Sequence, residues 1–535
     1  MSLSSSQIKD LLSEYVGKNP YLLSVKTHLS SGGELSSTQQ MMCKRLLTTV
    51  AIENNDTTLL PQKDMVSFKI DWDTYTIEKN GKTLSPFDFQ RLGVNWLLNT
   101  PRGILADEMG CGKTLQAIIA AVEKKAKKVL IVCPNTLKLN WKKEIEMFSK
   151  DEIFVIKKNS FESAKWIIVN YDKIHNFEKE FAKEKFDLLI GDEAHYAKSG
   201  RKARRSASFT RIANKIPNVW LLTGTPISNR PIDFYQLLKI CKHDLGRRKD
   251  LFGNRYCDPE VTQWGTSYKG ASNLKELHFK TQDVILRRTK NQVLDLPPKT
   301  LIPLYQELTK AQQKRYLAAA EDRFQEIYDG MYDEDSEHYG KDLEKGVEFI
   351  EMAAYRMFAA IEKVKDGTIK ETVGNIIDSD NKVVIFTNFT AVVDAVKEMY
   401  GDNCVTLDGR VKMDDRQDVI DLFQRKNGPQ VIVCNYKVGS VGVTLTEATY
   451  AIMNDLPWDP ATLKQAEDRI HRIGQTKKTT IYFPIYEDTI DLAMFSVLRE
   501  KIKYIDEIID GKKNLTKFKK GRSVQQEVMS LIKKV

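Results

Sequence analysis

Short, continuous apolar segments that alternate with helical stretches are the feature that most limits the folds open to this chain. Segments that are apolar at successive residues are buried on both faces, as in strands of a parallel sheet covered by helices. Two series of such segments lie at 103–106, 129–133, 166–169, 187–190 and 219–222, and at 382–386, 430–434, 450–453 and 480–484. We therefore predict an α/β chain with two parallel-sheet lobes and helical insertions.

A chain of 535 residues exceeds what one hydrophobic core usually covers. Near the N-terminus, alternating apolar residues over 66–72 and a turn signal at Asn80-Gly81 predict a small helical and β-hairpin appendage. The appendage either binds a partner or DNA, or packs on the lobe that follows. We predict an accessory region at 1–83, a first lobe at 84–300, a helical insertion at 301–375, a second lobe at 376–510 and a basic tail at 511–535.

A glycine-rich loop lies between the first apolar segment and a predicted helix. Gly110 and Gly112 allow a tight turn that aims backbone N–H groups at a polyphosphate, and the N-terminus of the helix favours an anion. We expect Lys113 to reach the outer phosphates and the hydroxyl of Thr114 to bind Mg²⁺. Asp107 stands where the usual loop has glycine. The predicted nucleotide contacts in this loop are Asp107, Gly110, Cys111, Gly112, Lys113 and Thr114.

Two carboxylates, Asp192 and Glu193, follow the apolar segment that ends at residue 190. In the lobe that holds Lys113, such a pair can serve nucleotide hydrolysis. We expect Asp192 to hold magnesium and Glu193 to orient the attacking water. A surface acid pair is the alternative, but such pairs seldom follow a wholly apolar strand downstream of a phosphate loop.

Two small hydroxyl residues and a glycine follow another apolar segment, at Thr223, Gly224 and Thr225. Alone they predict a turn. Beside the phosphate loop and the acid pair, they are candidates for a relay that senses phosphate and passes the change to the second lobe.

In the second lobe, Gln465, Arg469 and Arg472 are spaced four and three residues apart, which places them on one helix face. From there two guanidinium groups can meet phosphate oxygens held by the first lobe, as arginine fingers. The alternative is an exposed charged helix with internal Asp–Arg pairs.

Taken in order, these motifs resemble the Swi/Snf-type ATPases of helicase superfamily two over about residues 84–500. The matching motifs are Pro86-Phe87-Asp88-Phe89-Gln90, the loop from Asp107 to Thr114, Cys133-Pro134-Asn135-Thr136-Leu137, Asn170-Tyr171-Asp172, Asp192-Glu193-Ala194-His195, Leu222-Thr223-Gly224-Thr225-Pro226 with Asn229, Leu286-Arg287-Arg288-Thr289-Lys290 with Leu296-Pro297-Pro298-Lys299, and Arg469-Ile470-His471-Arg472-Ile473-Gly474-Gln475. The resemblance implies two RecA-like lobes, ATP and Mg²⁺ as cofactors and Gln90 as the adenine contact. It also accounts for Asp107.

Two departures from the family pattern favour one branch of it. Gly442-Val443-Thr444-Leu445 stands where the family often has Gly-Leu-Asn-Leu, and Trp458-Asp459-Pro460 replaces Trp-Asn-Pro. Together with Gln465-Ala466-Glu467-Asp468, the Thr444 form resembles the distant branch that contains annealing helicases more than it resembles nucleosome remodellers. We assign Gly442 to the coupling residues with Thr223, Gly224 and Thr225.

The resemblance also implies contacts to the phosphate backbone of duplex DNA from both lobes, without reading of sequence. For each candidate, simple solvent exposure is the alternative. The candidates are Thr136, Lys138, Lys198, Arg201, Lys202, Arg204 and Arg205 in the first lobe and Lys437, Ser440 and Thr444 in the second.

Bulk composition agrees with a polyanionic partner, since the formal net charge is +10, although 72 acidic residues make the field uneven. No apolar run is long enough to cross a bilayer, and the seven cysteines are scattered. We expect a soluble intracellular monomer with reduced thiols and no zinc. Its place is the cytoplasm or nucleoid in a prokaryotic or viral setting, and the nucleus in a eukaryote.

The sequence thus predicts an ATP-dependent translocase on double-stranded or branched DNA, with a role in DNA repair or recombination. It would remodel DNA junctions or protein–DNA complexes by fork regression, branch migration or strand annealing. Alternatives are a nucleosome remodeller, an RNA-directed helicase and a DNA-binding clamp that is gated by nucleotide without turnover.

Overall fold

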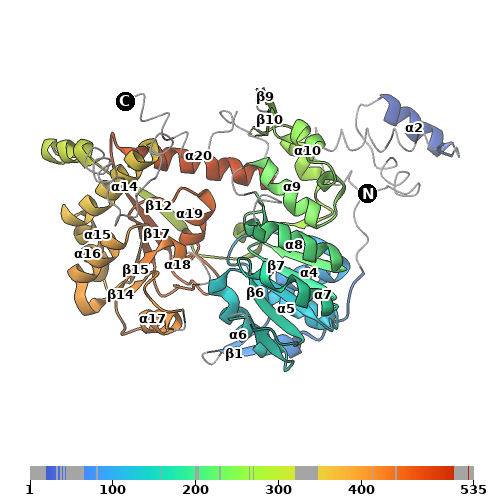
Figure 1. Ribbon diagram of the computed structural model, residues 1–535, viewed down its shortest axis with the longest axis horizontal. Coiled ribbons are helices and arrows are strands. Elements are labelled where there is room, and N and C mark those ends of the chain that lie inside the picture. Colours follow the sequence, from blue (N-terminus) through green and yellow to red (C-terminus); the bar gives the residue numbers. More distant parts are fainter. Residues whose placement is uncertain are drawn as a thin grey trace.

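The chain forms two α/β lobes that lie side by side (Figure 1). We describe a computed structural model. It describes residues 12, 20–31, 34–36, 39, 43, 66–79, 82–157, 160–198, 204–227, 230–263, 265–268, 270–319, 347–413, 415–439, 443–510 and 528.

The first lobe is built on a parallel sheet of seven strands. In spatial order they are β11 (Ile285–Leu286), β3 (Arg102–Leu105), β8 (Asn218–Leu222), β7 (Leu188–Asp192), β4 (Val129–Cys133), β6 (Trp166–Asn170) and β5 (Ile153–Val155). Every neighbouring pair is parallel. The carboxyl ends of β3, β8 and β7 therefore meet side by side at one edge of the sheet.

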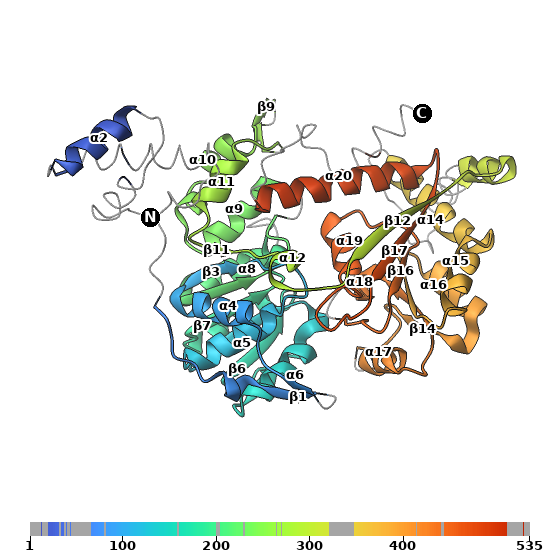
Figure 2. The same ribbon diagram turned by 180° about the vertical axis from the view of Figure 1, so that it is seen from behind.

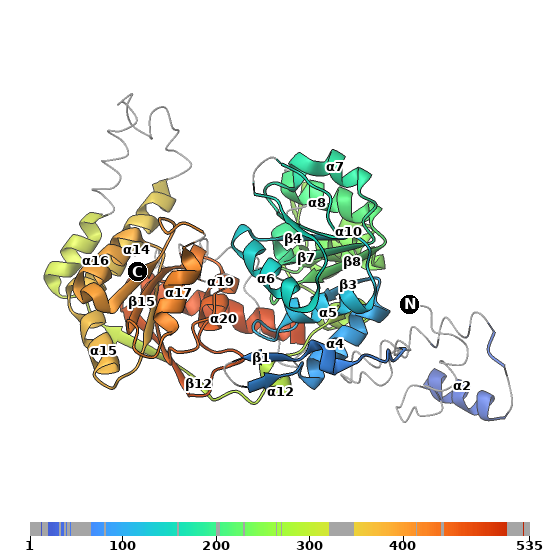
Figure 3. The same cartoon turned by 90° about the horizontal axis from the view of Figure 1, so that it is seen from below.

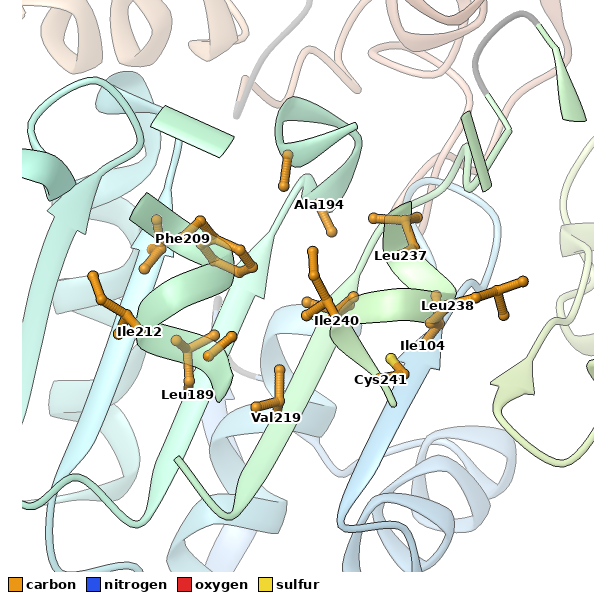
Figure 4. Packing of buried hydrophobic residues seen from close by; sticks show 14 of the residues in the cluster. Ile104, Leu189, Ala194, Phe209, Ile212, Val219, Leu237, Leu238, Ile240 and Cys241 are labelled. Atoms are coloured by element: carbon orange, nitrogen blue, oxygen red, sulfur yellow. The ribbon is translucent and has the colours of Figure 1, made fainter. Parts of the chain in front are cut away.

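Consecutive residues of the central strands face opposite sides of this sheet. Ile104 and Leu189 belong to one apolar core and Leu105 and Leu188 to the other. Figure 4 shows how Phe209 and its neighbours from the covering helices pack over the first of these cores. Burial on both faces explains why the segments are apolar at successive positions and confirms the predicted parallel-sheet lobe.

Helices cover both faces of the first sheet, and two short hairpins lie outside it. The helices are α4 (Asp88–Asn99), α5 (Lys113–Glu123), α6 (Lys138–Phe148), α7 (Glu178–Lys183), α8 (Arg204–Lys215), α9 (Pro231–Ile240), α10 (Lys249–Tyr256), α11 (Leu274–Lys280) and α12 (Lys290–Val293). The hairpins pair β1 (Ile77–Lys79) with β2 (Lys82–Leu84) and β9 (Glu260–Thr262) with β10 (Gly265–Ser267).

The second lobe contains a parallel sheet of six strands. Their spatial order is β12 (Lys299–Gln306), β17 (Thr479–Tyr486), β16 (Tyr450–Met453), β13 (Val383–Thr387), β15 (Val431–Asn435) and β14 (Cys404–Leu407). Two lobes with parallel sheets confirm the predicted fold class. β12 differs from expectation, because a helical insertion was predicted from residue 301. Its residues are mostly half-buried and include Pro303, which an edge strand tolerates.

The helices of the second lobe are α14 (Val347–Lys365), α15 (Thr368–Ile377), α16 (Thr390–Tyr400), α17 (Arg416–Gln424), α18 (Tyr436–Gly439), α19 (Pro460–Glu467) and α20 (Ile490–Asp510). Helix α20 leaves the second lobe and reaches α11 of the first (Figure 2). Residues 294–298 carry the chain from α12 to β12, between the lobes (Figure 3). In the described part of the chain, no helix has the length and apolarity needed to cross a membrane.

The N-terminal region differs from the predicted pattern. The alternating segment over 66–72 forms no strand. Its backbone instead pairs with asparagine side chains of α4, since Asn99 bonds both the N–H and the carbonyl of Val66 at 2.9 Å. The hairpin lies farther along, where Lys79 pairs with Lys82 around the predicted turn, and Asn80 and Gly81 fall outside the described residues. Helix α2 (Pro20–Ser30) precedes both.

The double-sided core generates a stability prediction. Leu189 is fully buried, so Leu189→Ala should lower the free energy of unfolding by about 2–5 kcal/mol. Leu251 is 57% exposed, and Leu251→Ala is the matched control that should stay within about 0.5 kcal/mol of the parent. Urea unfolding followed by tryptophan fluorescence measures both. Equal losses in the two variants would contradict the core described here.

Candidate functional site

Three predicted motifs meet at the carboxyl edge of the first sheet. The phosphate loop follows β3, the acid pair ends β7, and Thr223 follows β8. Because β3 and β7 both flank β8 in the sheet, the three motifs are neighbours in space. Ligands of open α/β sheets bind at this edge.

The phosphate loop has the backbone that its glycines predict. Gly110 and Gly112 have φ values of +81° and +73°, in the left-handed region that favours glycine. A Cβ on Gly112 would lie 2.3 Å from Nε2 of Gln90, so a side chain there would also clash. Nζ of Lys113 donates to the carbonyl of Asp107 at 2.7 Å, and Thr114 follows it, half-buried at the start of α5.

Gln90 supports the loop from behind. Its Oε1 accepts a hydrogen bond from the N–H of Phe87 at 3.0 Å, and its Nε2 donates to the carbonyl of Cys111 at 3.1 Å. The side chain is buried, as is Cys111. Both ends of this amide are thus held by protein, and the adenine contact assigned to Gln90 stays a prediction.

Asp107 is fully buried and bonds Arg288, with Nε of the arginine 2.8 Å from Oδ1. Nε2 of Gln116 donates to its other carboxylate oxygen at 3.2 Å. Both carboxylate oxygens are thus held by protein, and the nucleotide contact assigned to Asp107 stays a prediction. The carboxylate in place of glycine ties the phosphate loop to Arg288, which also donates to Oε1 of Gln116 at 2.9 Å and to the carbonyl of Phe89.

The acid pair lies at the end of β7. Asp192 accepts hydrogen bonds from Nε1 of Trp141 at 2.8 Å and from the N–H of Glu193 at 2.9 Å. Burial, and then the charge of Glu193, raises the pKa of the Asp192 carboxyl. A cation beside it would favour the ionised form.

Glu193 has a left-handed backbone, with φ +48°, which is uncommon outside glycine and typical of strained functional positions. Burial opposes its ionisation, but His195, at 3.4 Å, and the charges of Lys113 and Arg469 hold its pKa below the usual value. Glu193 therefore stays a carboxylate, as a group that orients water must. The carboxylate of Asp192 and the hydroxyl of Thr114 are hard oxygen donors, which fit Mg²⁺.

The predicted relay connects to the acid pair through His195. Nδ1 of His195 lies 3.5 Å from Oγ1 of Thr223, which accepts a hydrogen bond from the N–H of Thr225 at 3.1 Å. A Cβ on Gly224 would lie 2.5 Å from Cγ of Met109, so this turn packs directly on the phosphate loop. Gly442, the predicted partner in the second lobe, lies outside the described residues.

Helix α19 ends at Glu467, so Arg469 and Arg472 lie on the turns that follow it and not on one helix face with Gln465, as was predicted. The segment that carries them lies against the phosphate loop. A Cβ on Gly110 would lie 3.0 Å from Cβ of Arg472. Both Arg469 and Arg472 donate to the carbonyl of Val443, at 3.0 and 3.3 Å, and Nε of Arg469 donates to the carbonyl of Gln465 at 2.9 Å. Burial, and then the charge of Arg472, lowers the pKa of Arg469 to about 10.

Two further groups of contacts were not predicted from the sequence, where Arg287 and Glu108 were quoted as parts of motifs without a role and Lys464 was not quoted. Arg287 donates to the carbonyls of Ala106 and Gly224, at 2.9 and 3.0 Å, and so joins the phosphate loop to the relay. Between the lobes, Glu108 pairs with Lys464 at 3.2 Å. One sequence shows which residues are charged but not which groups they meet in the fold, so nothing in it pointed to these contacts.

The structure separates the candidate DNA contacts by exposure. It corrects the assignment of Lys138, which is buried and donates from Nζ to the carbonyl of Ile156 at 2.8 Å. Arg205 lies over the ring of Tyr196 and bonds Asp172 at 3.2 Å. Arg204 and Lys437 are exposed, whereas Thr136, Lys198 and Thr444 are half-buried. Arg201, Lys202 and Ser440 lie outside the described residues.

One departure from the family pattern has a local explanation. Asp459 is the N-cap of α19, and its Oδ2 accepts hydrogen bonds from the N–H and the hydroxyl of Thr462, both at 3.0 Å. Asp and Asn serve equally well at this position, so the replacement keeps the cap.

Comparison with known protein families finds two matching domains. Residues 89–350 match the SNF2-related domain, and residues 367–474 match the helicase conserved C-terminal domain. Together the two matches include the phosphate loop, the acid pair, the relay and both arginines.

Similar proteins include two long relatives. The SWI/SNF-related matrix-associated actin-dependent regulator of chromatin subfamily A-like protein 1 of Xenopus tropicalis is 30% identical, over 80% of this chain and 45% of its own length. The human DNA annealing helicase and endonuclease ZRANB3 is 31% identical, over 81% of this chain and 41% of its own length. The chain thus spans less than half of these relatives.

A Sulfolobus solfataricus SWI2/SNF2 ATPase core solved with dsDNA is 22% identical, with a TM-score of 0.36, over 80% of this chain and 95% of that one.

The buried pair beneath the phosphate loop generates a prediction. Arg288→Met leaves the buried carboxylate of Asp107 without its cation and should lower the free energy of unfolding by about 3–5 kcal/mol. Arg211→Met is the matched control, because Arg211 pairs with Glu178 at the surface and should lose at most about 1 kcal/mol. Denaturant unfolding of both variants checks this, and a loss no larger for Arg288 than for Arg211 would contradict it.

Proposed function

This chain belongs to the Swi/Snf-related family of helicase-type ATPases, and on that premise we propose that it hydrolyses ATP to move along double-stranded DNA. The observation that carries the proposal is the contact between Arg472 and Gly110, which brings a guanidinium-bearing segment of the second lobe onto the phosphate loop of the first. A site shared between two lobes can convert a change in phosphate into relative motion of the lobes.

The roles at the ATP site follow from position and charge. Lys113 and the N–H groups of the loop would hold the phosphates, and Glu193 would orient the water that attacks the terminal phosphorus. Mg²⁺, held by Asp192 and Thr114, would supply neutralisation of phosphate charge. Lys113 now bonds loop carbonyls, so it would exchange these bonds for phosphate oxygens when ATP binds.

The second lobe would complete the site. Arg469 and Arg472 would stabilise the charge that develops on the transferred phosphoryl group, with Gln465 beside them on the same segment. Departure of phosphate would be sensed by Glu193 and passed through His195 to Thr223, Gly224 and Thr225, with Gly442 as the predicted counterpart. The 3.5 Å approach of His195 to Thr223 supports this route.

Duplex or branched DNA would bind through phosphate contacts on both lobes. Arg204 and Lys437 are exposed and suit this role, and the net charge of +10 favours a polyanion. Thr136, Lys198, Arg205 and Thr444 remain candidates, as do Arg201, Lys202 and Ser440. The names of the relatives, one of which is called a DNA annealing helicase, support remodelling of DNA junctions as the outcome of this movement.

We further propose that the chain acts as a monomer in the compartment that holds DNA, in repair or recombination. Fork regression, branch migration and strand annealing all require movement along duplex DNA without reading its sequence, which phosphate contacts permit. The division into an accessory region, two lobes, an insertion and a basic tail remains part of this proposal.

Substitutions of Glu193 and Lys113 separate ATP turnover from ATP binding. Glu193→Gln should keep ATP binding and lower kcat by about 100-fold or more, because the amide cannot take a proton from water. Lys113→Ala should instead weaken ATP binding itself. Phosphate release and titration of a fluorescent ATP analogue measure the two effects. Glu152→Gln, at an exposed carboxylate, is the control, and full turnover in Glu193→Gln would contradict the proposed role.

DNA should stimulate hydrolysis, and the stimulation should fall steeply with added salt because phosphate contacts release counterions. Replacing both Arg204 and Lys437 with alanine should flatten the dependence of log affinity on log salt by about one unit for each lost contact. ATPase rates with duplex DNA, forked DNA, nucleosomes and RNA rank the substrates. Strongest stimulation by forked DNA supports junction remodelling, strongest stimulation by nucleosomes or RNA overturns it, and equal rates without nucleic acid contradict DNA dependence.

A further inference from the structure

Lys290 belongs to the first lobe, yet its ammonium group bonds the second. It begins α12 and is only 4% exposed. Its Nζ donates to the carbonyl of His471 at 2.6 Å and pairs with Oδ1 of Asp468 at 2.7 Å. These two acceptors lie on either side of Arg469, and the second arginine follows His471 directly. Through this hydrogen bond and this ion pair, the ammonium group binds the segment that carries both guanidinium groups.

The backbone of the same lysine is fixed by the phosphate loop. Its N–H donates to Oε2 of Glu108 at 2.8 Å, and the N–H of Glu108 donates to the carbonyl of Arg288 at 2.9 Å. The other oxygen of Glu108 pairs with Lys464 of α19 at 3.2 Å. One carboxylate of the loop therefore holds Lys290 on one side and the arginine-bearing lobe on the other.

The stem of Lys290 also lies against the loop. A Cβ on Gly110 would lie 3.5 Å from Cε of Lys290 and 3.0 Å from Cβ of Arg472. Loop, lysine and arginine segment therefore meet at one point. Removing charges from water is costly, so a buried pair of this kind adds little net stability.

We propose that Lys290 is a positioning residue for ATP hydrolysis, which places Arg469 and Arg472 against the phosphate loop through Asp468 and the carbonyl of His471. The proposal rests on the proposed ATPase function and deepens it. The short helix α12, which follows β11, would then take a direct part in assembling the site from two lobes. Hydrolysis would then depend on a lysine that bonds protein groups of the second lobe and not the nucleotide.

The test uses the full chain with saturating duplex DNA. Lys290→Met keeps the length of the stem and removes the ammonium group. We expect kcat to fall by about 10- to 100-fold, as for a small misplacement of a catalytic group, with KM for ATP changed by less than about threefold. An increase in KM with kcat intact would overturn the proposal, because it would place Lys290 on the nucleotide.

A double variant tests whether Lys290 acts through the arginine. Lys290→Met combined with Arg472→Ala should turn over ATP within about twofold of Arg472→Ala alone, because groups that act as one unit are not additive. Multiplicative losses would overturn the proposal. Asp468→Asn weakens the same pair from the second lobe and should reproduce the kcat defect, so it serves if Lys290→Met does not fold.

A control variant separates this role from simple loss of a lysine charge that pairs with α19 beside the arginine segment. Lys299 pairs with Glu467 of α19 at 3.1 Å, next to but outside the arginine segment. Lys299→Met should leave kcat within about threefold of the parent even if the protein melts at a lower temperature. Failure of the unmodified chain to hydrolyse ATP would defeat the proposed function, whereas a fully active Lys290→Met would defeat this inference alone.

Discussion

A missing side chain at Gly110 allows the second lobe to rest on the phosphate loop. Cβ of Arg472 and Cε of Lys290 approach the position that a Cβ would occupy there, at 3.0 and 3.5 Å. The same residue has a left-handed backbone, so two separate requirements select glycine. The shared site depends on this close approach, since a side chain at Gly110 would press on Arg472.

Charged groups surround this contact, and most of them are buried. Asp468 is 2% exposed and Lys290 is 4% exposed, and each finds its partner only when the lobes are together. The attraction between them is largely offset by the water that each must lose. The closed and open arrangements of the lobes can therefore be close in free energy. A ligand that makes slightly better contacts with one arrangement can then shift the equilibrium toward it.

Sequence reasoning went furthest where local chemistry leaves few choices. The central strands of both sheets were predicted because burial on both faces requires apolar residues throughout, and the loop around Gly110 was predicted because its backbone requires glycine. β12 was missed because a half-buried edge strand has a mixed pattern. The ammonium of Lys138 was misassigned because sequence position does not show that it turns inward to a carbonyl. Pairs such as Lys290 with Asp468 join residues far apart in the chain, so no local pattern reveals them.

The segment between α12 and β12 sets a limit on how the molecule can open. Residues 294–298 span at most about 17 Å when fully extended, and Pro297 and Pro298 restrict their torsions. The carbonyl of Pro297 is bonded to Nε2 of His471 at 2.9 Å. Because this connecting segment is short and conformationally restricted, it limits how far the two lobes can separate. In the proposed movement along DNA, the two lobes would rotate about this segment, and its length would limit how far each rotation carries them.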